Sequence, residues 1–403
     1  MSSMKVGVLQ DFLMPQASQQ VMLDALRLAF DESYADGEID RPVELVLRAV
    51  DGLPRGTSFD VLNAWKELEA EGVLVIFGPW ASDNVLAIRN YVEDVGHIPT
   101  LSMSGTDRWY GEWCFCINNG SLPEEPYLLS NYLGVRGVES VAVVYDKCVP
   151  GEEYTRFFRD ACAFDGVKIA IEEPINMLDT DLSPALARLQ ASGADAIAYL
   201  GWGLTATHLN TALDGTGWNP VKVMSSGFMA APFLPGGLKS IAGWVGVDQY
   251  DEDNVVGQDF LDRFEARFGY RPANFFSVLC YDFGVVIARG LSKATPLSPD
   301  GVKEGLEKVK MVPAATGGPG GVFSFGPHAR RAWLTPHFIV LREPDPAAEV
   351  ADLTSGPGSV LRHRYTARSR SERLGIAAHP ATEPTQRPSP PSDGAPPVTE
   401  RLQ

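Results

Sequence analysis

The sequence predicts an α/β fold of two lobes, each a doubly wound, mostly parallel sheet with helices on both faces. Short β-rich runs alternate with helical patterns from Lys5 onward, which is typical of βαβ units. The alternation stops at the turn-rich "NNGSLPEEP" and then restarts as a second series. At 403 residues the chain is also too long for one compact core. We therefore expect two domains followed by a tail.

The first series opens with the strand-like run "KVGVL". Met22, Leu26, Ala29 and Phe30 follow at helical spacing and predict an amphipathic helix. The series continues with "PVELVLRAV", "VLNAWKELEA", "VLVIF" and "WCFCI", which predict strand, helix, strand and strand. These elements make up the first sheet and part of its helical cover.

The second series contains the strand runs "VAVVY", "VKIAI", "DAIAY" and "VKVMS", again separated by helical patterns. After "WVGVDQY" we expect a helix with Phe260, Phe264 and Phe268 on one face, and another from about Phe275 to Leu291. Late "GGVFSF" and "HFIVL" predict closing strands. From about Pro344 the composition changes to Pro, Ser, Thr, Arg and Ala, which predicts a disordered tail.

Composition excludes several classes of partner. The 34 Lys and Arg residues against 51 Asp and Glu give a net charge of -17, which repels nucleic-acid phosphates and anionic headgroups. No apolar stretch approaches the length of a membrane span, and "MSSMKVGVLQ" has neither a basic region nor an apolar leader, so we expect a cytoplasmic protein as written. Five scattered cysteines predict packed thiols, with no disulfide framework, metal or cofactor.

The two series share a layout around a tryptophan. Each series contains the same succession of elements: the end of a helix, a strand, a turn with Gly and Trp, and a new helix. The two stretches are "LEAEGVLVIFGPWASDNVLAI" and "LQASGADAIAYLGWGLTATHL". Trp80 and Trp202 are thereby placed at the carboxyl ends of parallel strands, the edge where open α/β sheets bind ligands. If the lobes face each other, both tryptophans border one cleft.

This layout resembles the type I periplasmic binding proteins, in particular the leucine/isoleucine/valine-binding branch that feeds ABC transporters. The resemblance covers about Lys5 to Leu341. The resemblance rests on six stretches: "KVGVLQDF", "DALRLAFDE", "GVLVIFGPWASDN", "HIPTLSMSGT", "VAVVYDKCVPGEEY" and "NFFSVLCYDFGVVIARGL". The family fold implies discontinuous lobes joined by three hinge crossings, and a ligand that closes the hinge by touching both lobes.

The resemblance also implies where the lobes begin and end. We expect lobe one at residues 4–119 and 252–325, lobe two at residues 120–251 and 326–343, and the tail at residues 344–403. The crossings are expected near Asn118 to Ser121, near Tyr250 to Asn254 and near Phe325 to Ala329.

Five residues of lobe one match ligand positions of the family. Ser82 begins a helix after the Gly-Pro turn, where a hydroxyl and free N–H groups can receive a carboxylate or carbonyl oxygen. Ser104 and Thr106 fall where the family contacts the ligand's carboxylate. Phe12 falls where a side chain covers the ligand, and Trp80 could form a wall. The alternative for Ser82 is a plain helix N-cap, and for Ser104 and Thr106 an ordinary place as polar turn residues. For Phe12 and Trp80 the alternative is packing in the core.

In lobe two, Trp202 and the backbone at Gly203 match an aromatic ligand position, and Gly227 matches the position of the acidic residue that receives an amino acid's ammonium. No carboxylate stands in the stretch around Gly227, and Pro150 replaces an aromatic wall of the family. Because a buried ammonium without a partner is costly, these departures favour an aromatic or alicyclic acid, an amide or a related molecule. Asp248 or Asp251 near the hinge could supply a replacement charge.

Gly201-x-Gly203-x-x-Ala206 raises a rival interpretation, a dinucleotide-binding turn in an NAD-dependent oxidoreductase. The following strand should then end in an acidic residue for the ribose hydroxyls, but "PVKVMSSGF" ends in Met and Ser. The sequence also has no Gly-x-Ser-x-Gly elbow, no His-Glu-x-x-His helix and no phosphate loop. We therefore expect a protein that is not an enzyme.

The predicted function is the capture of a small organic ligand for an ABC-type permease. The alternative is a cytoplasmic sensor of the amide-sensor type, which binds a ligand and then releases or grips a regulatory protein. The family's transport members are exported, so the sequence as written leaves both possibilities open.

Overall fold

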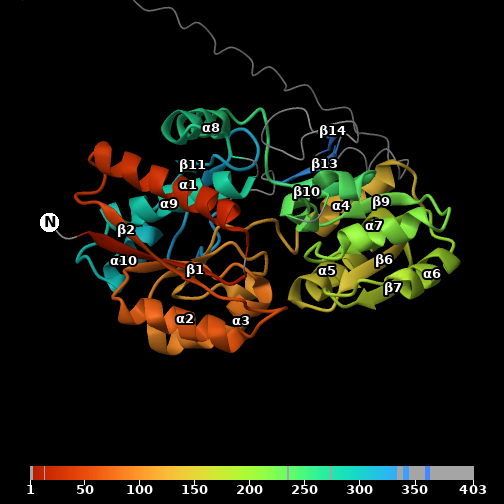
Figure 1. The fold of residues 1–403 in the computed structure, drawn as a ribbon, viewed down its shortest axis with the longest axis horizontal. Coiled ribbons are helices and arrows are strands. Elements are labelled where there is room, and N and C mark those ends of the chain that lie inside the picture. The colour runs from red at the N-terminus through yellow and green to blue at the C-terminus, as the bar shows by residue number, and fades with distance from the viewer. Residues whose placement is uncertain are drawn as a thin grey trace, which may run out of the picture. The chain divides into compact units, whose positions relative to one another are not determined.

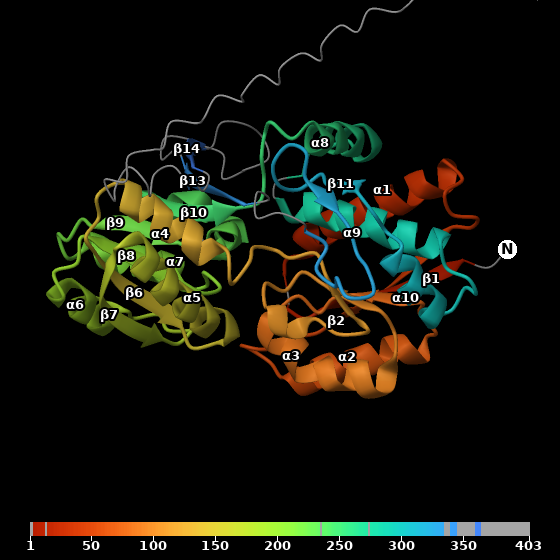
Figure 2. The ribbon, with the colours of Figure 1, turned by 180° about the vertical axis from the view of Figure 1, so that it is seen from behind.

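The structure is a computed structural model that describes residues 3–12, 14–233, 236–272, 275–333, 339–344 and 359–363. All of these residues belong to one compact unit within residues 1–365. Two main sheets organise that unit, each with helices on both faces (Figures 1 and 2). The structure confirms the predicted fold class.

The sheet of lobe one has five parallel strands in the order β2-β1-β3-β4-β5. The strands are β1 (Met4–Gln10), β2 (Val43–Ala49), β3 (Val75–Phe77), β4 (Thr100–Ser102) and β5 (Cys114–Cys116). The helices and short strands of the lobe are α1 (Gln16–Ala35), α2 (Ser58–Ala70), α3 (Ser82–Tyr91), η1 (Val92–Gly96), η2 (Asp107–Trp109), α8 (Val255–Phe268), α9 (Phe275–Ser292), α10 (Pro299–Glu307), β11 (Val312–Pro313) and β12 (Val322–Phe323).

Alternation along the buried strands places helices on both faces of this sheet. Val75 and Phe77 belong to the apolar cluster that includes α1 and α9, whereas Ile76 belongs to the cluster that includes α2 and α3. Successive side chains of a strand point to opposite faces, so one short apolar run contributes to two cores. Figure 1 shows α1 and α9 on one side of the sheet and α2 and α3 on the other.

The sheet of lobe two has seven strands in the order β14-β13-β10-β9-β8-β6-β7. They are β6 (Ser140–Asp146), β7 (Lys168–Ile175), β8 (Ala196–Leu200), β9 (Val221–Met224), β10 (Trp244–Asp248), β13 (Val340–Pro344) and β14 (Ser359–His363), of which β13 and β14 are antiparallel to their neighbours. The helices are α4 (Glu125–Val135), α5 (Val149–Asp165), α6 (Ser183–Ala191), α7 (Ala206–Asp214), η3 (Ser226–Phe233) and η4 (Gly237–Ile241).

Both lobes use the same local strand order. The first strand of each lobe lies between the second and the third, so strand order reverses between β1 and β3 and between β6 and β8. In lobe two Val141 and Val143 join the core under α4 and α5, and Ala142 and Val144 join the core under α6 and α7. Ligands of open α/β sheets bind at such reversal points, beyond the carboxyl ends of the strands.

The third crossing lies later in the chain than the sequence suggests. We expected it near Phe325 to Ala329, but Gly326 and Ala329 close a tight turn there. The chain then still runs beside β5, because the Cys116 N–H donates to Arg330 at 2.8 Å and Cys116 accepts from the Ala332 N–H at 2.9 Å. Residues 325–333 therefore still lie beside lobe one, and no crossing occurs at residues 325–329.

The segment predicted to be a disordered tail contains one strand. Residues 359–363 form β14, which pairs antiparallel with β13. The short run "SVLRH" can pair there because β13 offers a free edge of backbone groups to an added strand. The remainder of residues 345–403 lies outside the described residues, so the prediction of disorder stays a prediction.

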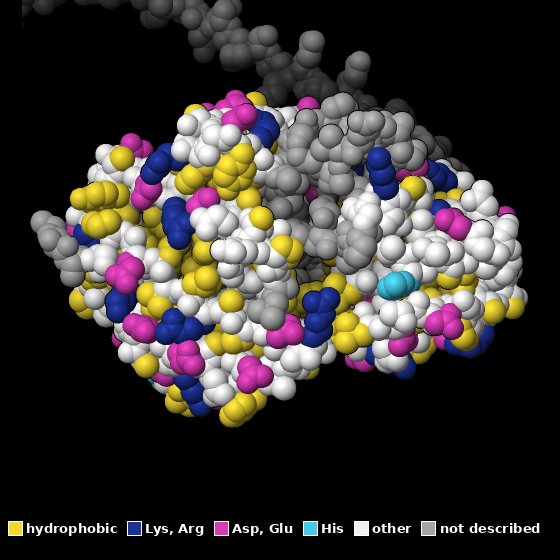
Figure 3. All heavy atoms as spheres, viewed as in Figure 1, with side chains coloured by type: hydrophobic (Ala, Val, Ile, Leu, Met, Phe, Trp, Pro, Cys, Tyr) yellow, Lys and Arg dark blue, Asp and Glu magenta, His cyan; other side chains and the backbone are white. Residues whose placement is uncertain are grey.

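Among the helices that the structure describes, none combines the length and apolarity needed to cross a bilayer. On the face drawn in Figure 3, basic and acidic side chains are interspersed and form no basic stripe.

A buried polar network joins the crossings. The Gly120 N–H donates to Gln249 Oε1 at 2.7 Å, and Gln249 Nε2 donates to the Asn118 carbonyl at 2.8 Å, so one side chain ties the second crossing to the first. Arg342 on β13 forms ion pairs with Asp248 and with Glu252, each at 2.6 Å. Asp248 is thus engaged at the hinge.

Replacing Gln249 with Ala should destabilise the protein by about 2 kcal/mol, because a buried N–H and a buried carbonyl lose their shared partner. Urea unfolding followed by circular dichroism measures this. Gln190→Ala on the exposed surface of α6 is the matched control and should change stability by less than about 0.5 kcal/mol. Equal effects of the two substitutions would contradict the role of Gln249 as a hinge tie.

Candidate functional site

A cavity of about 300 Å³ lies where the loops of the two lobes meet. Its walls come from loops that follow the carboxyl ends of β1, β2, β3 and β4 in lobe one and of β6, β8 and β9 in lobe two, together with the first crossing and α9. The lining residues are Phe12, Met14, Pro15, Met22, Asp51, Leu53, Pro54, Arg55, Trp80, Ser82, Met103, Ser104, Gly105, Asn119, Leu122, Pro150, Tyr154, Gly201, Trp202, Leu204, Ser226, Gly227, Ala230 and Phe276.

In lobe one a buried carboxylate holds the tryptophan turn. Asp11 directly follows β1 and accepts hydrogen bonds from the N–H groups of Trp80 and Ala81 at 2.8 and 3.0 Å and from Asn84 Nδ2 at 2.8 Å. Burial raises the pKa of Asp11, and these three donors oppose that rise. The edge of the Phe12 ring packs on Trp80, with ring centroids 5.2 Å apart.

In lobe two Asp146 has the equivalent role at the end of β6. Its Oδ2 accepts from the Trp202 N–H at 2.8 Å, and both of its oxygens lie 3.1 Å from the Tyr199 hydroxyl. Burial raises the pKa of Asp146 to about 7. Each lobe therefore presents a tryptophan at its reversal point from a turn held by the neighbouring strand's aspartate.

These contacts argue against the dinucleotide interpretation. The Trp202 N–H is engaged by a carboxylate, and the Gly201 N–H donates to Ser225 Oγ at 3.1 Å. A Cβ on Gly201 would meet Asp146 Oδ2 at 2.2 Å, so the aspartate lies against the turn where a pyrophosphate would need N–H donors. The glycines serve close packing within the lobe.

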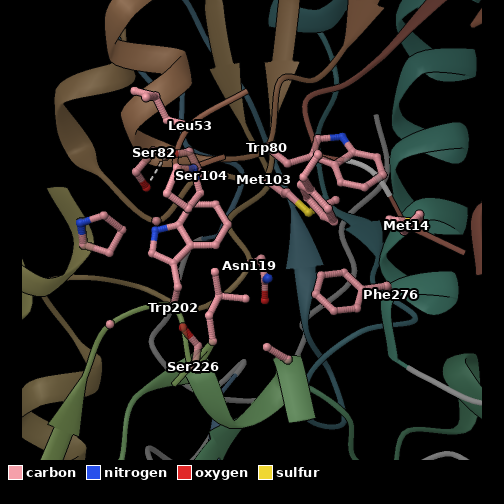
Figure 4. A pocket seen from close by; sticks show the side chains of 18 of the residues that line it. Met14, Leu53, Trp80, Ser82, Met103, Ser104, Asn119, Trp202, Ser226 and Phe276 are labelled. Atoms are coloured by element: carbon pink, nitrogen blue, oxygen red, sulfur yellow. Dashed lines mark hydrogen bonds between the residues drawn. The ribbon is translucent and has the colours of Figure 1, made fainter. Parts of the chain in front are cut away.

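Six of the predicted ligand residues line the cavity: Phe12, Trp80, Ser82, Ser104, Trp202 and Gly227. Figure 4 shows Trp202 extending from lobe two toward Ser82 and Ser104, with Trp80 on the other side of Asn119. Ser82 and Ser104 lie together, with their hydroxyl oxygens 3.0 Å apart. Whether these residues contact a ligand stays a prediction.

Two other predicted residues do not line the cavity. Gly203 packs against lobe two itself, and a Cβ there would meet the carbonyl oxygen of Gly227 at 2.3 Å. Thr106 is fully buried, and its hydroxyl donates to Glu153 of lobe two at 2.9 Å. The Thr106 hydroxyl, which the family resemblance assigned to the ligand, thus forms a hydrogen bond between the two lobes. Asp248 and Asp251, suggested as replacement charges, are not among the lining residues either.

Further contacts beside the cavity join the lobes. Arg108 Nη1 lies 3.3 Å from Glu153 Oε1, so Glu153 of α5 receives two groups from lobe one. Asp83 on α3 accepts from the Val149 N–H, the first of α5, at 3.0 Å. A carboxylate at a helix N-terminus is favoured because the first N–H groups lack partners within the helix. These bonds hold the lobes together beside the cavity.

Tyr154 is a cavity residue that the sequence interpretation missed. The aromatic wall judged absent at Pro150 is supplied one turn later, because residues four apart on α5 share a face. The i, i+4 spacing within "VPGEEY" was the available signal. Asn119, on the first crossing, was also missed, and its buried Oδ1 has no hydrogen-bond partner among the described residues.

Glu125 was missed as well. The stretch around Gly227 contains no carboxylate, but the fold brings Glu125 to it, and Glu125 accepts from the Ser226 N–H at 2.6 Å. Its other partners are the Ser121 N–H at 2.6 Å and the Tyr154 hydroxyl at 2.8 Å. Burial raises the pKa of Glu125 to about 7. No local sequence signal reveals this contact, because the two residues are 101 positions apart.

The cavity has few ionisable groups. Apart from Tyr154, Asp51 and Arg55 are the ionisable side chains among its described lining residues, and both lie in the loop after β2. No group of His, Cys, Asp and Glu that could hold a metal ion occurs among the described residues. The walls are mainly aromatic, Met, Leu and Pro side chains with a few hydroxyls and one carboxamide. Such lining suits a small molecule with an apolar body and a small polar end.

Two α/β lobes that enclose such a cavity at their reversal points define a two-lobed binding-protein architecture. A sequence model of the family described as periplasmic binding protein matches residues 3–334 of the chain. The chain therefore belongs to the periplasmic binding protein family, as its resemblance implied.

Solved structures share this fold. A periplasmic binding protein type 1 from Bordetella pertussis has 17% identity and a TM-score of 0.74, over 86% of this chain and 98% of that chain. The branched-chain amino acid transporter substrate-binding protein of Streptococcus pneumoniae, solved in complex with isoleucine, has 19% identity and a TM-score of 0.71, over 86% and 97%.

A curated relative resembles part of the chain. The leucine-, isoleucine-, valine-, threonine- and alanine-binding protein of Pseudomonas aeruginosa is 25% identical over 173 residues. This match covers 42% of the chain and 45% of the relative's length, less than half of each.

Removing the carboxylate of Glu153 should loosen the contact between the lobes. Glu153→Ala breaks the buried bond to Thr106 and the ion pair to Arg108, which removes about 2 kcal/mol from the arrangement in which the lobes touch. We expect a larger radius of gyration for the ligand-free variant in small-angle X-ray scattering. The neighbouring exposed Glu152→Ala is the matched control and should scatter like the parent protein. Identical curves for the two variants would contradict a role of Glu153 in closure.

Proposed function

We propose that the protein binds a small organic molecule between its lobes with hinge closure, as the substrate-binding component of an ABC-type uptake system. The observation that carries this proposal is the pair of tryptophan turns, one from each lobe, that border the same cavity. A ligand in that cavity touches both lobes only when they are closed, so its binding favours closure. Membership of the periplasmic binding protein family supports this role and a site of action outside the cytoplasmic membrane.

The lining residues favour binding over catalysis. Covalent or acid–base catalysis needs a nucleophile hydrogen-bonded to a base, or a titratable group beside the reacting atoms. The described lining contains no His, Cys or Lys, and its ionisable side chains are Asp51, Arg55 and Tyr154. The hydroxyls of Ser82 and Ser104 are paired with each other, with no base beside them among the described residues. Membership of the periplasmic binding protein family supports the proposal that the protein holds its ligand and releases it unchanged.

The ligand that fits best has an apolar body and a small polar head, as in branched-chain or aromatic acids, their amides and the corresponding amino acids. Trp80, Trp202 and Phe276 offer flat apolar surface. Ser82 offers a hydroxyl at the start of α3, where a carboxylate or carbonyl oxygen is favoured, and the Ser104 hydroxyl, from the loop after β4, lies beside it. The names of the Pseudomonas and Streptococcus relatives support an amino-acid-like head.

A thermal-shift screen tests the proposal. The panel contains L-leucine and L-phenylalanine, their 2-hydroxy acids, their unsubstituted acids 4-methylpentanoate and 3-phenylpropanoate, and the two matching unsubstituted amides. A member with a Kd near 1 μM, about 8 kcal/mol of binding, should add about 2.7 kcal/mol of stability at a concentration of 100 Kd. Stabilisation by NADH with none of the panel active would overturn the proposal.

Replacing Trp202 with Ala should weaken the panel member that binds by about tenfold, because stacking and buried apolar area are both lost. Isothermal titration calorimetry measures the change. Trp218→Ala removes a half-buried tryptophan of lobe two that does not line the cavity and should leave affinity within about twofold. Unchanged affinity in Trp202→Ala would place that indole outside the binding surface.

A further inference from the structure

Behind the lobe-two wall of the cavity lies the carboxyl group of Glu125, the first residue of α4. It is fully buried and bonded to two backbone N–H groups and to the Tyr154 hydroxyl, as described above. No Lys, Arg or His side chain among the described residues forms a hydrogen bond or ion pair with it. Tyr154 and Ser226 line the cavity, so two neutral hydroxyls stand between this carboxyl group and an occupant.

The bonds of Glu125 impose a direction on those hydroxyls. The Tyr154 hydroxyl donates its proton to Glu125 Oε1 at 2.8 Å, and the hydroxyl oxygens of Tyr154 and Ser226 are 2.7 Å apart. A hydroxyl has one proton and two lone pairs, and the Ser226 side chain also hydrogen-bonds Glu125, so when Glu125 is ionised the Ser226 proton points to Tyr154 or to the carboxylate itself. Ser226 then has only lone pairs left to present to the cavity.

The first crossing is built around this carboxyl group. Gly120 has a positive φ of +68°, and a Cβ there would meet Glu125 Oε1 at 2.1 Å and Ser226 Oγ at 2.8 Å. A side chain at residue 120 would therefore displace the carboxyl group from the wall. The same glycine donates its N–H to Gln249, so the hydroxyl chain and the hinge tie share one residue.

We infer that Glu125 is a specificity-determining positioning residue, which acts through Tyr154 and Ser226 to make the lobe-two wall accept a hydrogen bond from an ammonium, hydroxyl or amide N–H of the ligand. The inference rests on the proposed function and deepens it. The ligand's oxygen-bearing end then faces Ser82 and Ser104, and its donor end faces Ser226. A second carboxylate at the donor end is disfavoured, because Ser226 offers no proton and a buried negative charge lies behind it.

The acceptor state depends on pH. Burial raises the pKa of Glu125 to about 7, so the carboxylate form exists above this pH, and protonation below it allows the chain of hydroxyls to reverse and Ser226 to donate. Tyr154 on α5 and, beyond it, Cys148 are the titratable groups facing this cluster, and burial holds the pKa of each well above its ordinary value. Ser121 and Ser226 do not titrate. Asp146 at the Trp202 turn titrates in the same range, so a Glu125 variant is needed to assign the effect.

The test uses ligands that differ only at the group facing Ser226. L-Leucine, 2-hydroxy-4-methylpentanoate and 4-methylpentanoate share a side chain and a carboxylate and carry an ammonium, a hydroxyl or a hydrogen, and the phenylalanine series repeats the comparison. By calorimetry at pH 8 the full-length protein should prefer the ammonium member over the unsubstituted acid by about tenfold or more, with the hydroxy acid between them. The preference should shrink at pH 6, although the ammonium and carboxylate of the ligands keep their charges.

Glu125→Gln should reduce this preference to about twofold and remove its pH dependence. Asp282→Asn is the matched control: Asp282 is likewise buried, its pKa is likewise raised to about 7 by burial, and it likewise accepts two backbone N–H groups and one hydroxyl, but in lobe one, away from the cavity. This variant should keep the preference. If Glu125→Gln fails to fold, Ser226→Ala removes only the presented hydroxyl and should also abolish the preference.

The outcomes separate the two proposals. A parent protein that binds no panel member overturns the proposed function and this inference together. A parent protein that binds both members of a matched pair equally well, or a Glu125→Gln or Ser226→Ala variant that keeps the preference, overturns the inference and leaves the proposed function standing. Loss of the preference in Asp282→Asn to the same extent as in Glu125→Gln would also overturn it.

Discussion

Two buried carboxylates, Asp11 and Asp146, hold the parts of the site that face each other. Each follows or ends the first strand of its lobe and accepts the N–H of a tryptophan in the turn after the third strand. A tight turn at a sheet edge exposes N–H groups that would otherwise need water or a ligand. Because each aspartate satisfies such an N–H group from within the lobe, Trp80 and Trp202 are presented to the cavity on rigid backbone. The remaining cavity surface is then available for recognition by shape and by a few hydroxyls.

The hinge and the recognition surface are parts of one polar network. Gly120 and Ser121 of the first crossing connect to Gln249 of the second crossing and to Glu125, whose hydroxyl chain ends at the cavity wall. Under the proposed hinge closure, a hydrogen bond to Ser226 acts on the same network as the backbone of the first crossing. In the proposal, a donor group of the ligand that bonds Ser226 stabilises the closed state, in addition to the apolar contacts that the lobes supply. The same residues would then take part in closure and in ligand selection.

Sequence pattern predicts the parts of this structure that depend on local order. Strands buried on both faces read as continuous apolar runs, and the Gly- and Trp-bearing turns follow two of them, so both sheets and both tryptophans are predictable. Contacts between segments that are distant in sequence are not predictable in this way. Thr106 occupies the family's ligand position in sequence, yet its hydroxyl is taken by Glu153 from the other lobe. The contact between Glu125 and Ser226 likewise depends on how the first crossing folds. Such pairings follow from three-dimensional packing and produce no periodic pattern in the sequence.

Amide hydrogen exchange measured by mass spectrometry, with and without the panel member that binds, tests the central claim most directly. A ligand enclosed between both lobes should slow exchange at the turn of Trp80 and Ser82 and at the segments of Trp202 and Ser226 together, with little change on the outer helix α6. Protection confined to one lobe, or located away from both turns, would contradict the account of a site formed by the two lobes.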